Sequence, residues 1–333
     1  MIAAAVLAAA IAITLVFDFT NGFHDSANSV AALVATRAAT PVAALLLAAG
    51  CHVAGPLLVG TTVADTVGGV VRLPAVDVLP AVGAAVTAGI VWNLLTWWRG
   101  LPASSSHALV GGLAGASGFA GVRWGGIDGL HVSGVLGVLA GLALSPLLGA
   151  GLGAAADLLV RRALRRARRE VDTVLRRAEW LTAGALAFSH GANDAQKSMG
   201  VITLLLVATG HLEAFAVPLW VKLAAAAALT LGTASGGWRV VKTVGRGIYR
   251  MRPADGLASQ GSSAAVILAA AAAGAPVSTT HVVAASVVGA GASRRVRHVR
   301  WAVVGEICSA WLITLPACAV LGAAALPVWR WWA

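Results

Sequence analysis

Charged side chains are scarce in this sequence, and their scarcity excludes a soluble globular protein. Asp, Glu, Lys and Arg make up 11% of the 333 residues, whereas soluble domains carry about 25%. The mean hydropathy is +0.84, so we expect an all-α polytopic membrane protein. The net charge of +11 does not indicate a nucleic-acid partner, because the basic residues are clustered between apolar stretches, as in the cytoplasmic loops of membrane proteins.

Cysteine is scarce as well. Cys51, Cys308 and Cys318 are scattered and embedded in apolar sequence, so neither a disulfide framework nor a cysteine metal site is expected. The first sixteen residues lack the basic segment that opens a signal peptide. We therefore expect them to form a retained first span.

Long apolar stretches are abundant instead. A helix needs roughly 20 apolar residues to cross the bilayer. Ten stretches qualify: 2–36, 41–62, 76–98, 102–120, 131–159, 180–208, 214–234, 257–274, 276–293 and 301–329. The first and the sixth are too long for one straight span and carry polar residues in mid-course. We expect these two helices to be broken or unwound near the bilayer centre, where surrounding protein or a water-filled cavity satisfies the backbone.

The clusters of basic residues predict the topology. Residues 161–177 contain eight arginines, and cytoplasmic loops are enriched in Lys and Arg. With this loop in the cytoplasm, nineteen basic residues lie inside, at Arg37, Arg99, 161–177, 239–252 and 294–300. Outside lie Arg72, Arg123 and Arg330, while Lys197 and Lys222 fall within spans. We expect a multi-pass protein of the plasma membrane with both termini outside.

The eight-arginine loop separates two halves of five stretches each. We expect a first repeat at 1–160, a basic cytoplasmic linker at 161–179 and a second repeat at 180–333. Because five is odd, the second half enters the membrane in the opposite sense. This is the inverted-topology repeat of secondary transporters.

Two polar motifs occur once in each half. The segment 19–29 aligns with 188–198, which places Asp25 on Asp194 at an offset of 169 residues. Pro-Ala-Ser-Ser-Ser-His at 102–107 aligns with Pro-Val-Ser-Thr-Thr-His at 276–281, at an offset of 174. The shared order and the similar offsets indicate an internal duplication.

The first motif offers cation ligands. Asp25 and Asn28 share a helix face because they are three residues apart, and Asp194 and Lys197 share the equivalent face. A carboxylate at the bilayer centre costs about 2.5–3.5 kcal/mol on insertion scales, so intramembrane acids mark functional sites. Carboxylate, amide and hydroxyl oxygens suit Na⁺, and a protonatable Asp suits H⁺. The alternative is that these residues, with His24 and His190 among them, are hydrogen-bonded packing residues.

The second motif offers an anion site. Its proline suits the first turn of a helix, and three hydroxyl or small polar side chains follow. Free backbone N–H groups at a helix N-terminus attract anions, so two such ends are expected to converge on one tetrahedral oxyanion. Helix capping without a ligand is the alternative.

An oxyanion can bind next to the two aspartates only if a positive charge is bound with it. Unit charges about 4 Å apart interact by roughly 4 kcal/mol at an effective dielectric of 20. A doubly charged oxyanion beside two carboxylates is therefore unfavourable unless a cation or proton lies between them. This requirement is the physical basis of symport.

The segments 21–28, 189–200, 232–245 and 276–281 closely resemble signatures of the inorganic phosphate transporter (Pit) family, in its short bacterial form. The resemblance implies cation-coupled phosphate uptake by alternating access, with H⁺ favoured over Na⁺, re-entrant hairpins at the second motif, no cofactor and no enzymatic activity. It implies a phosphate site at Ser104, Ser105, Ser106, Ser278, Thr279, Thr280, Asn28, Gln196 and Lys197. It implies coupling residues at Asp25, Asn28, Asp194, Asn193 and Asn21, with Asp25 and Asp194 holding Na⁺ if Na⁺ is the coupling ion.

The sequence departs from the family pattern at one position, and three alternative functions are also considered. Ser259-Gln260 stands where many relatives carry Ala-Glu, so an amide replaces a carboxylate and removes a Na⁺ ligand. Alternatives are a transporter of another oxyanion such as sulfate, an intramembrane hydrolase built on Ser105, His107 and Asp25, and a phosphate sensor. The hydrolase would need a nucleophile elbow, which this sequence does not contain.

The expected partners follow from the same interpretation. They are the lipid bilayer and inorganic phosphate, either free or as a metal–phosphate complex. A homodimer and a cytoplasmic regulatory partner at residues 161–177 are two further hypotheses. No nucleic-acid partner is expected.

Overall fold

The computed structural model describes residues 2–69, 73–122, 132–167 and 171–332, and these residues form helices and no strands. The all-α expectation is confirmed. The first half contains α1 (Ile2–Ala35), α2 (Pro41–Leu58), α3 (Thr62–Gly68), α4 (Ala75–Arg99), α5 (Ser105–Val122) and α6 (Val132–Ala163). The second half contains α7 (Val171–Ala208), α8 (Leu219–Ser235), α9 (Trp238–Lys242), the π-helix η1 (Thr243–Gly247), α10 (Pro253–Ala272), α11 (Thr279–Arg294), the 3₁₀-helix η2 (Val296–His298) and α12 (Trp301–Trp332).

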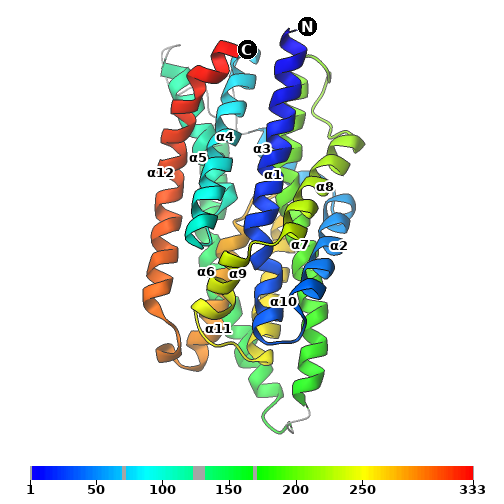
Figure 1. Cartoon of the computed structure of the whole chain (residues 1–333), viewed down its shortest axis with the longest axis vertical. Coiled ribbons are helices and arrows are strands. Elements are labelled where there is room, and N and C mark those ends of the chain that lie inside the picture. Colours follow the sequence, from blue (N-terminus) through cyan, green and yellow to red (C-terminus); the bar gives the residue numbers. More distant parts are fainter. Residues whose placement is uncertain (1, 70–72, 123–131, 168–170, 333) are drawn as a thin grey trace.

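The helices that carry the first motif, α1 and α7, are long and unbroken, with 34 and 38 residues. They lie against one another and run in opposite directions, as inverted repeats require (Figure 1). The expectation of breaks in these two helices was wrong. The physical reason is that their polar side chains find partners on neighbouring segments, so the backbone N–H and C=O groups stay in helical hydrogen bonds.

The breaks lie instead in the helices that flank α1 and α7. One break lies between α2 and α3 at Gly60, whose φ is 90°. The other lies between α8 and α9 at Gly236, whose φ is 70°. The direction changes by 62° between α8 and the segment formed by α9 and η1. Glycine adopts this left-handed backbone without a steric penalty, so both turns occur at residues suited to them.

Two helical hairpins, α4–α5 and α10–α11, enter from opposite ends and meet beside α1 and α7 (Figure 1). Gly100 (φ 68°) and Gly274 (φ 69°) make the two turns, each two residues before the proline of a second motif. The 16 residues of α11 extend only about 24 Å, less than the roughly 30 Å of hydrocarbon. Both copies of the second motif therefore lie at buried hairpin turns inside the molecule. That the hairpins are re-entrant stays a prediction.

Close helix contact brings the site together. A Cβ atom built at Gly22 of α1 would lie 2.0 Å from the Leu229 carbonyl oxygen of α8, and one at Gly232 of α8 would lie 2.0 Å from the Phe19 carbonyl oxygen. Only glycine permits this approach. The crossing fixes the middle of α1, where the first motif lies.

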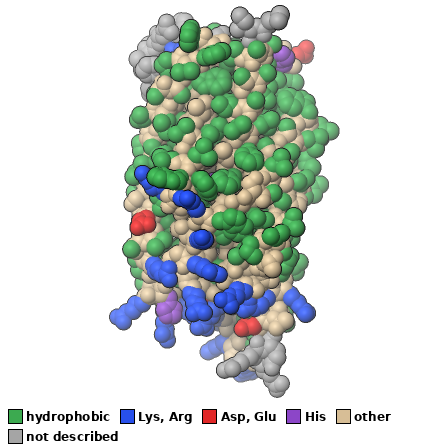
Figure 2. Space-filling model, in the orientation of Figure 1, with side chains coloured by type: hydrophobic (Ala, Val, Ile, Leu, Met, Phe, Trp, Pro, Cys, Tyr) green, Lys and Arg blue, Asp and Glu red, His purple; other side chains and the backbone are tan. Residues whose placement is uncertain are grey.

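The helix lengths and the charge distribution suit a membrane protein. Five described helices are long and apolar enough to cross a bilayer, and α8 with α9 and η1 forms a bent pair that is either a broken span or a re-entrant segment. Both chain termini lie at one end of the molecule (Figure 1). Lys and Arg side chains gather at the opposite end (Figure 2). This end is called the basic end here, and one cavity brings together seven of its arginines: Arg37, Arg176, Arg246, Arg250, Arg252, Arg294 and Arg300.

Some expectations about topology stay predictions. Which end faces the cytoplasm is one, and the division into 1–160, 161–179 and 180–333 is another. Within the proposed linker, α6 extends to Ala163 and α7 begins at Val171, so both ends of that linker are helical. Arg72, Arg123 and residues 168–170 lie outside the described residues.

Candidate functional site

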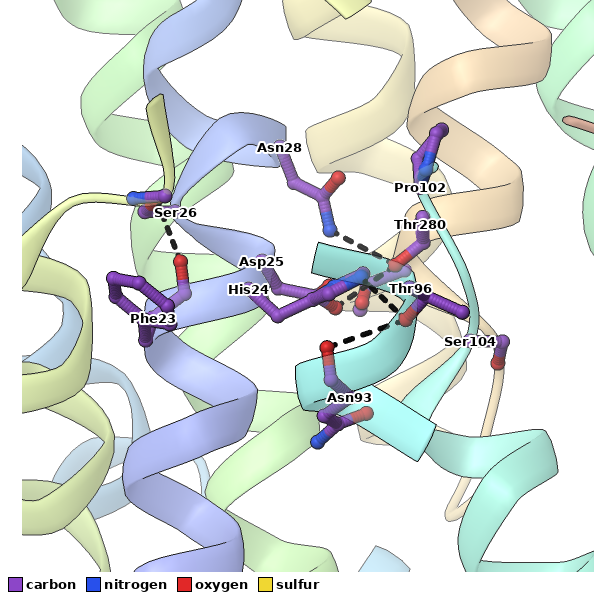
Figure 3. A network of polar contacts seen from close by, with 12 residues as sticks. Phe23, His24, Asp25, Ser26, Asn28, Asn93, Thr96, Pro102, Ser104 and Thr280 are labelled. Carbon is purple, nitrogen blue, oxygen red and sulfur yellow. Dashed lines mark hydrogen bonds and ion pairs between the residues drawn. The ribbon is translucent and has the colours of Figure 1, made fainter. Parts of the chain in front are cut away.

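Asp25, near the middle of α1, has both carboxylate oxygens engaged (Figure 3). His24 Nδ1 lies 2.6 Å from Oδ1, and the Thr280 hydroxyl donates to Oδ2 at 2.8 Å. His24 Nε2 lies 3.2 Å from the Leu101 carbonyl oxygen and 3.2 Å from the Thr96 hydroxyl. A carbonyl only accepts, so Nε2 donates to Leu101. The proton in the 2.6 Å contact then resides on either His24 Nδ1 or Asp25 Oδ1.

Asp194, the equivalent residue of α7, is held by three donors. His190 Nε2 lies 2.8 Å from Oδ2, the Thr279 hydroxyl donates to Oδ2 at 3.1 Å, and the Lys197 ammonium donates to Oδ1. His190 and Lys197 lie one turn either side of Asp194 on the same helix face. Asp194 is completely buried, and a buried charge is tolerated only with such partners.

The second copy of the second motif, residues 276–281 at the start of α11, contacts both aspartates. Thr279 and Thr280 open α11, and they bind Asp194 and Asp25 respectively. Asn28 Nδ2 also donates to the Thr280 hydroxyl, at 3.2 Å. Ligand atoms of His190 and both aspartates lie within 4.8 Å of one another. The two copies of the first motif thus meet at one place, together with the second copy of the other motif.

Ser104 and Ser278 act as helix caps. Their hydroxyls accept the backbone N–H groups of His107 and His281, each at 3.2 Å. The capping interpretation therefore describes the contacts of these two residues. Each hydroxyl still has its own proton to donate, so their assignment to phosphate binding stays a prediction.

The two copies of the second motif, 102–107 and 276–281, are called the anion loops here, and they are in contact with each other. The Ser106 hydroxyl donates to the Val277 carbonyl oxygen at 3.3 Å, and the His107 and His281 rings stack with centroids 4.5 Å apart. Ser105, at the start of α5, is buried beside them.

A small cavity marks the space between the loops. Ser106, Lys197 and Pro276 are among the residues that line it, and its volume is about 10 Å³. This is room for roughly one water molecule.

Three other predicted site residues lie at the margin. Gln196 Oε1 accepts the backbone N–H of Val63 at 2.9 Å, and its Nε2 donates to the Ala192 carbonyl at 2.6 Å, so the side chain is occupied at the start of α3. Asn193 donates to the Ala275 carbonyl at 3.3 Å, next to the second anion loop. Asn21 is buried on α1. The structure does not bring Gln196 to the aspartate pair.

Two further polar residues near the site were given no role in the sequence analysis. Asp18 is fully buried on α1, and neither of its carboxylate oxygens has a hydrogen-bond partner among the described residues. Its spacing of seven from Asp25 places it on the same helix face and was a usable signal. His52 of α2 lies 3.0 Å from His190 Nδ1 and 2.8 Å from the Thr233 hydroxyl. A single histidine in an apolar stretch gave no such signal.

A buried acid, Glu179, lies near Gln260, the residue that stands where many relatives carry Glu. Gln260 Oε1 accepts from the Thr182 hydroxyl at 3.1 Å. One turn earlier on α7, the fully buried Glu179 accepts from the Thr36 hydroxyl at 2.6 Å. Glu179 precedes the expected span 180–208, and burial raises the pKa of its carboxyl group to about 8. The carboxyl group in this region thus comes from α7 and is largely protonated at neutral pH.

Helices of this length, arranged as two antiparallel halves around a buried acid and hydroxyl site, define a membrane transporter. The chain belongs to the phosphate transporter family, whose model matches residues 21–171 and again residues 161–322. The first match contains residues 21–29 of the first motif and the whole of the second motif at 102–107, and the second match contains 188–198 and 276–281. Since this family consists of transporters, the chain is not an enzyme.

Relatives and one solved structure agree with this assignment. A protein of Rhizobium meliloti described as a probable low-affinity inorganic phosphate transporter is 39% identical, over 94% of this chain and 93% of its own length. One from Bacillus subtilis with the same description is 39% identical over 93% of each chain. A solved structure entitled "The sodium-dependent phosphate transporter" is 26% identical, with a TM-score of 0.86, over 97% of this chain and 98% of that one.

Proposed function

We propose that this protein imports inorganic phosphate together with a cation by alternating access, with H⁺ favoured over Na⁺, across a plasma membrane in which both termini lie outside. The observation that carries the proposal is the contact of one loop with both aspartates. Thr279 and Thr280 would donate to phosphate oxygens, yet they bind Asp194 and Asp25. The acids and the anion thus compete for the same two hydroxyl donors, which links phosphate binding to the charge of the acids.

The chemistry around the aspartates supports H⁺. Their neighbours are two imidazoles, an ammonium group and two hydroxyls, which supply protons and N–H or O–H donors. The Lys197 ammonium repels a bound Na⁺, and Gln196, an oxygen ligand on the same helix, is engaged elsewhere.

Uptake of radiolabelled phosphate into proteoliposomes tests the proposal. We expect accumulation when a proton gradient, acidic outside, is the only driving force, and none when a Na⁺ gradient is imposed at equal pH. Excess sulfate outside should leave uptake unchanged. Accumulation driven by Na⁺ alone would contradict proton coupling and leave phosphate transport intact, whereas competition by sulfate would broaden the substrate.

One observation favours a metal–phosphate complex as the transported form. The side chains of Asp25, His190 and Asp194 converge within 4.8 Å, and imidazole with two carboxylates is a donor set suited to divalent transition metals. Such an ion would have to displace the Lys197 ammonium from Asp194, since that ammonium repels any cation there. Uptake should then rise when Mn²⁺ or Zn²⁺ is added with phosphate and fall with a chelator. Equal uptake under both conditions would show that free phosphate is the substrate.

A further inference from the structure

A large cavity at the basic end lies apart from the aspartate site. Its volume is about 890 Å³. Segments of both halves line it: the end of α1, the beginning of α7, η1 with the chain after it, the start of α10, the end of α11 and the residue before α12. Figure 2 shows the Lys and Arg side chains that crowd this end of the molecule. The cavity therefore sits where the two halves come together.

The charge of this cavity is strongly positive. Seven arginines line it, together with His298 and a single carboxylate residue, Asp255. Asp255 pairs with Arg294 at 3.5 Å and accepts the backbone N–H of Arg252 at 3.0 Å. Burial raises the pKa of the Asp255 carboxyl group. One carboxyl group cannot balance seven guanidinium groups.

Several of these arginines are available to a ligand. Arg176 donates to the Thr36 carbonyl, and Arg300 donates to the Arg246 carbonyl at 3.0 Å. In contrast, the side chains of Arg246 and Arg250 are exposed and form no ion pair with any described residue. Like charges gathered around a hollow repel one another, so the arrangement gains stability when an anion enters.

Tyr249 provides an independent indication of a ligand. Its side chain lines the cavity and is 4% exposed, and its hydroxyl has no hydrogen-bond partner among the described residues. A Cβ atom at Gly291 would lie 2.9 Å from the tyrosine ring, so that glycine leaves room for the ring. Burial raises the pKa of Tyr249, so the hydroxyl keeps its proton. A buried donor without an acceptor is unfavourable.

We propose that this cavity binds an anion carrying two or more phosphate groups, at a site separate from the transport site. Guanidinium groups bind phosphate oxygens in pairs, and Tyr249 donates to one further oxygen. The cavity falls in the range of about 300–1,000 Å³ typical of small-molecule sites, so it holds more than one phosphate group. The source is either a soluble oligophosphate or the headgroup of a diphosphate lipid.

The test compares two double variants of the purified full-length protein. Arg246→Gln with Arg250→Gln removes two charges that line the cavity. Arg295→Gln with Arg297→Gln removes two charges from exposed side chains at the same end that do not line it. Calorimetry with tripolyphosphate measures the soluble arm. Native mass spectrometry of protein taken from cardiolipin nanodiscs measures the lipid arm.

We expect the wild type and the Arg295/Arg297 variant to bind alike and the Arg246/Arg250 variant to bind at least tenfold more weakly in one arm. Tyr249→Phe should also weaken binding, by a few-fold. Binding should persist in Thr279→Ala, which alters the transport site only.

Three results would overturn the proposal. Equal weakening in both double variants would mean general attraction to a basic surface. Loss of binding in Thr279→Ala would mean that the probe occupies the transport site. If the wild type binds neither tripolyphosphate nor cardiolipin, the cavity is not a site for an anion with two or more phosphate groups.

Discussion

At the scale of single residues, the aspartate pair should determine whether transport is concentrative. Asp→Asn keeps the size and one oxygen but removes the charge that a cation neutralises. We expect Asp25→Asn and Asp194→Asn to insert normally and to lose accumulation of phosphate against a gradient. Exchange of phosphate across the membrane should survive, because anion binding no longer requires a cation. Uptake and counterflow in proteoliposomes distinguish the two activities, and undiminished accumulation in both variants would remove these residues from the mechanism.

The hydroxyls of the anion loops should contribute to affinity. A hydrogen bond to a charged group is worth about 1.5–3 kcal/mol, so Thr279→Ala or Ser105→Ala should weaken apparent phosphate affinity roughly ten- to a hundred-fold. The control is Ser309→Ala on α12, whose exposed hydroxyl bonds only to the Gly305 carbonyl of its own helix. Uptake rates at a series of phosphate concentrations give the comparison. Unchanged kinetics in both loop variants would make these loops helix caps.

Glu179 should make stability depend on pH. Its pKa in the folded protein is about 8, above the ordinary value of 4.5, because the side chain is buried. The protonated form is therefore favoured by folding, and its stabilisation, complete below about pH 4.5, is lost as the pH rises through 8. The slope for one proton is about 1.4 kcal/mol per pH unit.

Glu179→Gln should reduce the fall in melting temperature between pH 5.5 and 8.5. The control is Glu213→Gln, which changes an exposed side chain between α7 and α8 and should behave as the wild type. Identical slopes for all three proteins would show that Glu179 is not protonated in the folded state at neutral pH.

Sequence reasoning found the residues that occur twice and missed most of those that occur once. Asp25 and Asp194 were identified because two polar motifs stand out in apolar sequence and repeat each other. His52 could not be identified, because its contact with His190 joins positions 138 apart in the chain. Gln196 lies in a motif, but its amide is taken by the backbone of α3, a short helix whose start the sequence did not indicate.

At the scale of helices, the crossing of α1 and α8 should tolerate no added methyl group. Gly232→Ala would place Cβ only 2.0 Å from the Phe19 carbonyl oxygen, and overpacking of this kind costs about 1–3 kcal/mol. Gly151→Ala on α6 is the control, since nothing lies within 4 Å of the added atom. That variant should be neutral or more stable, because alanine favours helix by up to about 1 kcal/mol.

Melting temperatures in detergent should therefore move in opposite directions for the two variants, or fall only for Gly232→Ala. A fall of equal size in both would show that the close crossing is not tight in solution.

Helix continuity was the part of the fold that the sequence concealed. Polar residues in mid-span suggested unwinding of α1 and α7, yet Asp25 and Asp194 are satisfied by side chains such as Thr280 and His190. A single sequence does not show which neighbours a helix will have. The hairpins at the second motif were expected from the family resemblance, whereas the glycines that make their turns, Gly100 and Gly274, were not used in the sequence analysis.

At the scale of the whole molecule, the basic end should face the cytoplasm. In a variant without Cys51, Cys308 and Cys318, a cysteine introduced at His211, at the end opposite the basic residues, should react with an impermeant thiol reagent in intact cells. A cysteine introduced at Arg297 should react only after permeabilisation. Labelling of the Arg297 position in intact cells would reverse the orientation.

The loop at 276–281 hydrogen-bonds both aspartates, so the contacts of the two halves differ although their motifs match. Among the described residues, Asp25 and Asp194 are bonded by Thr280 and Thr279, and neither is bonded by Ser105 or Ser106. Exchanging the halves turns these contacts into Ser106 on Asp194 and Ser105 on Asp25. The alternating-access proposal predicts a second conformer with the roles of the halves exchanged, in which serine stands where this one has threonine. The two methyl groups that distinguish these pairs are then a bias between the conformers, and swapping serine for threonine should change how long the empty protein waits on each side of the membrane.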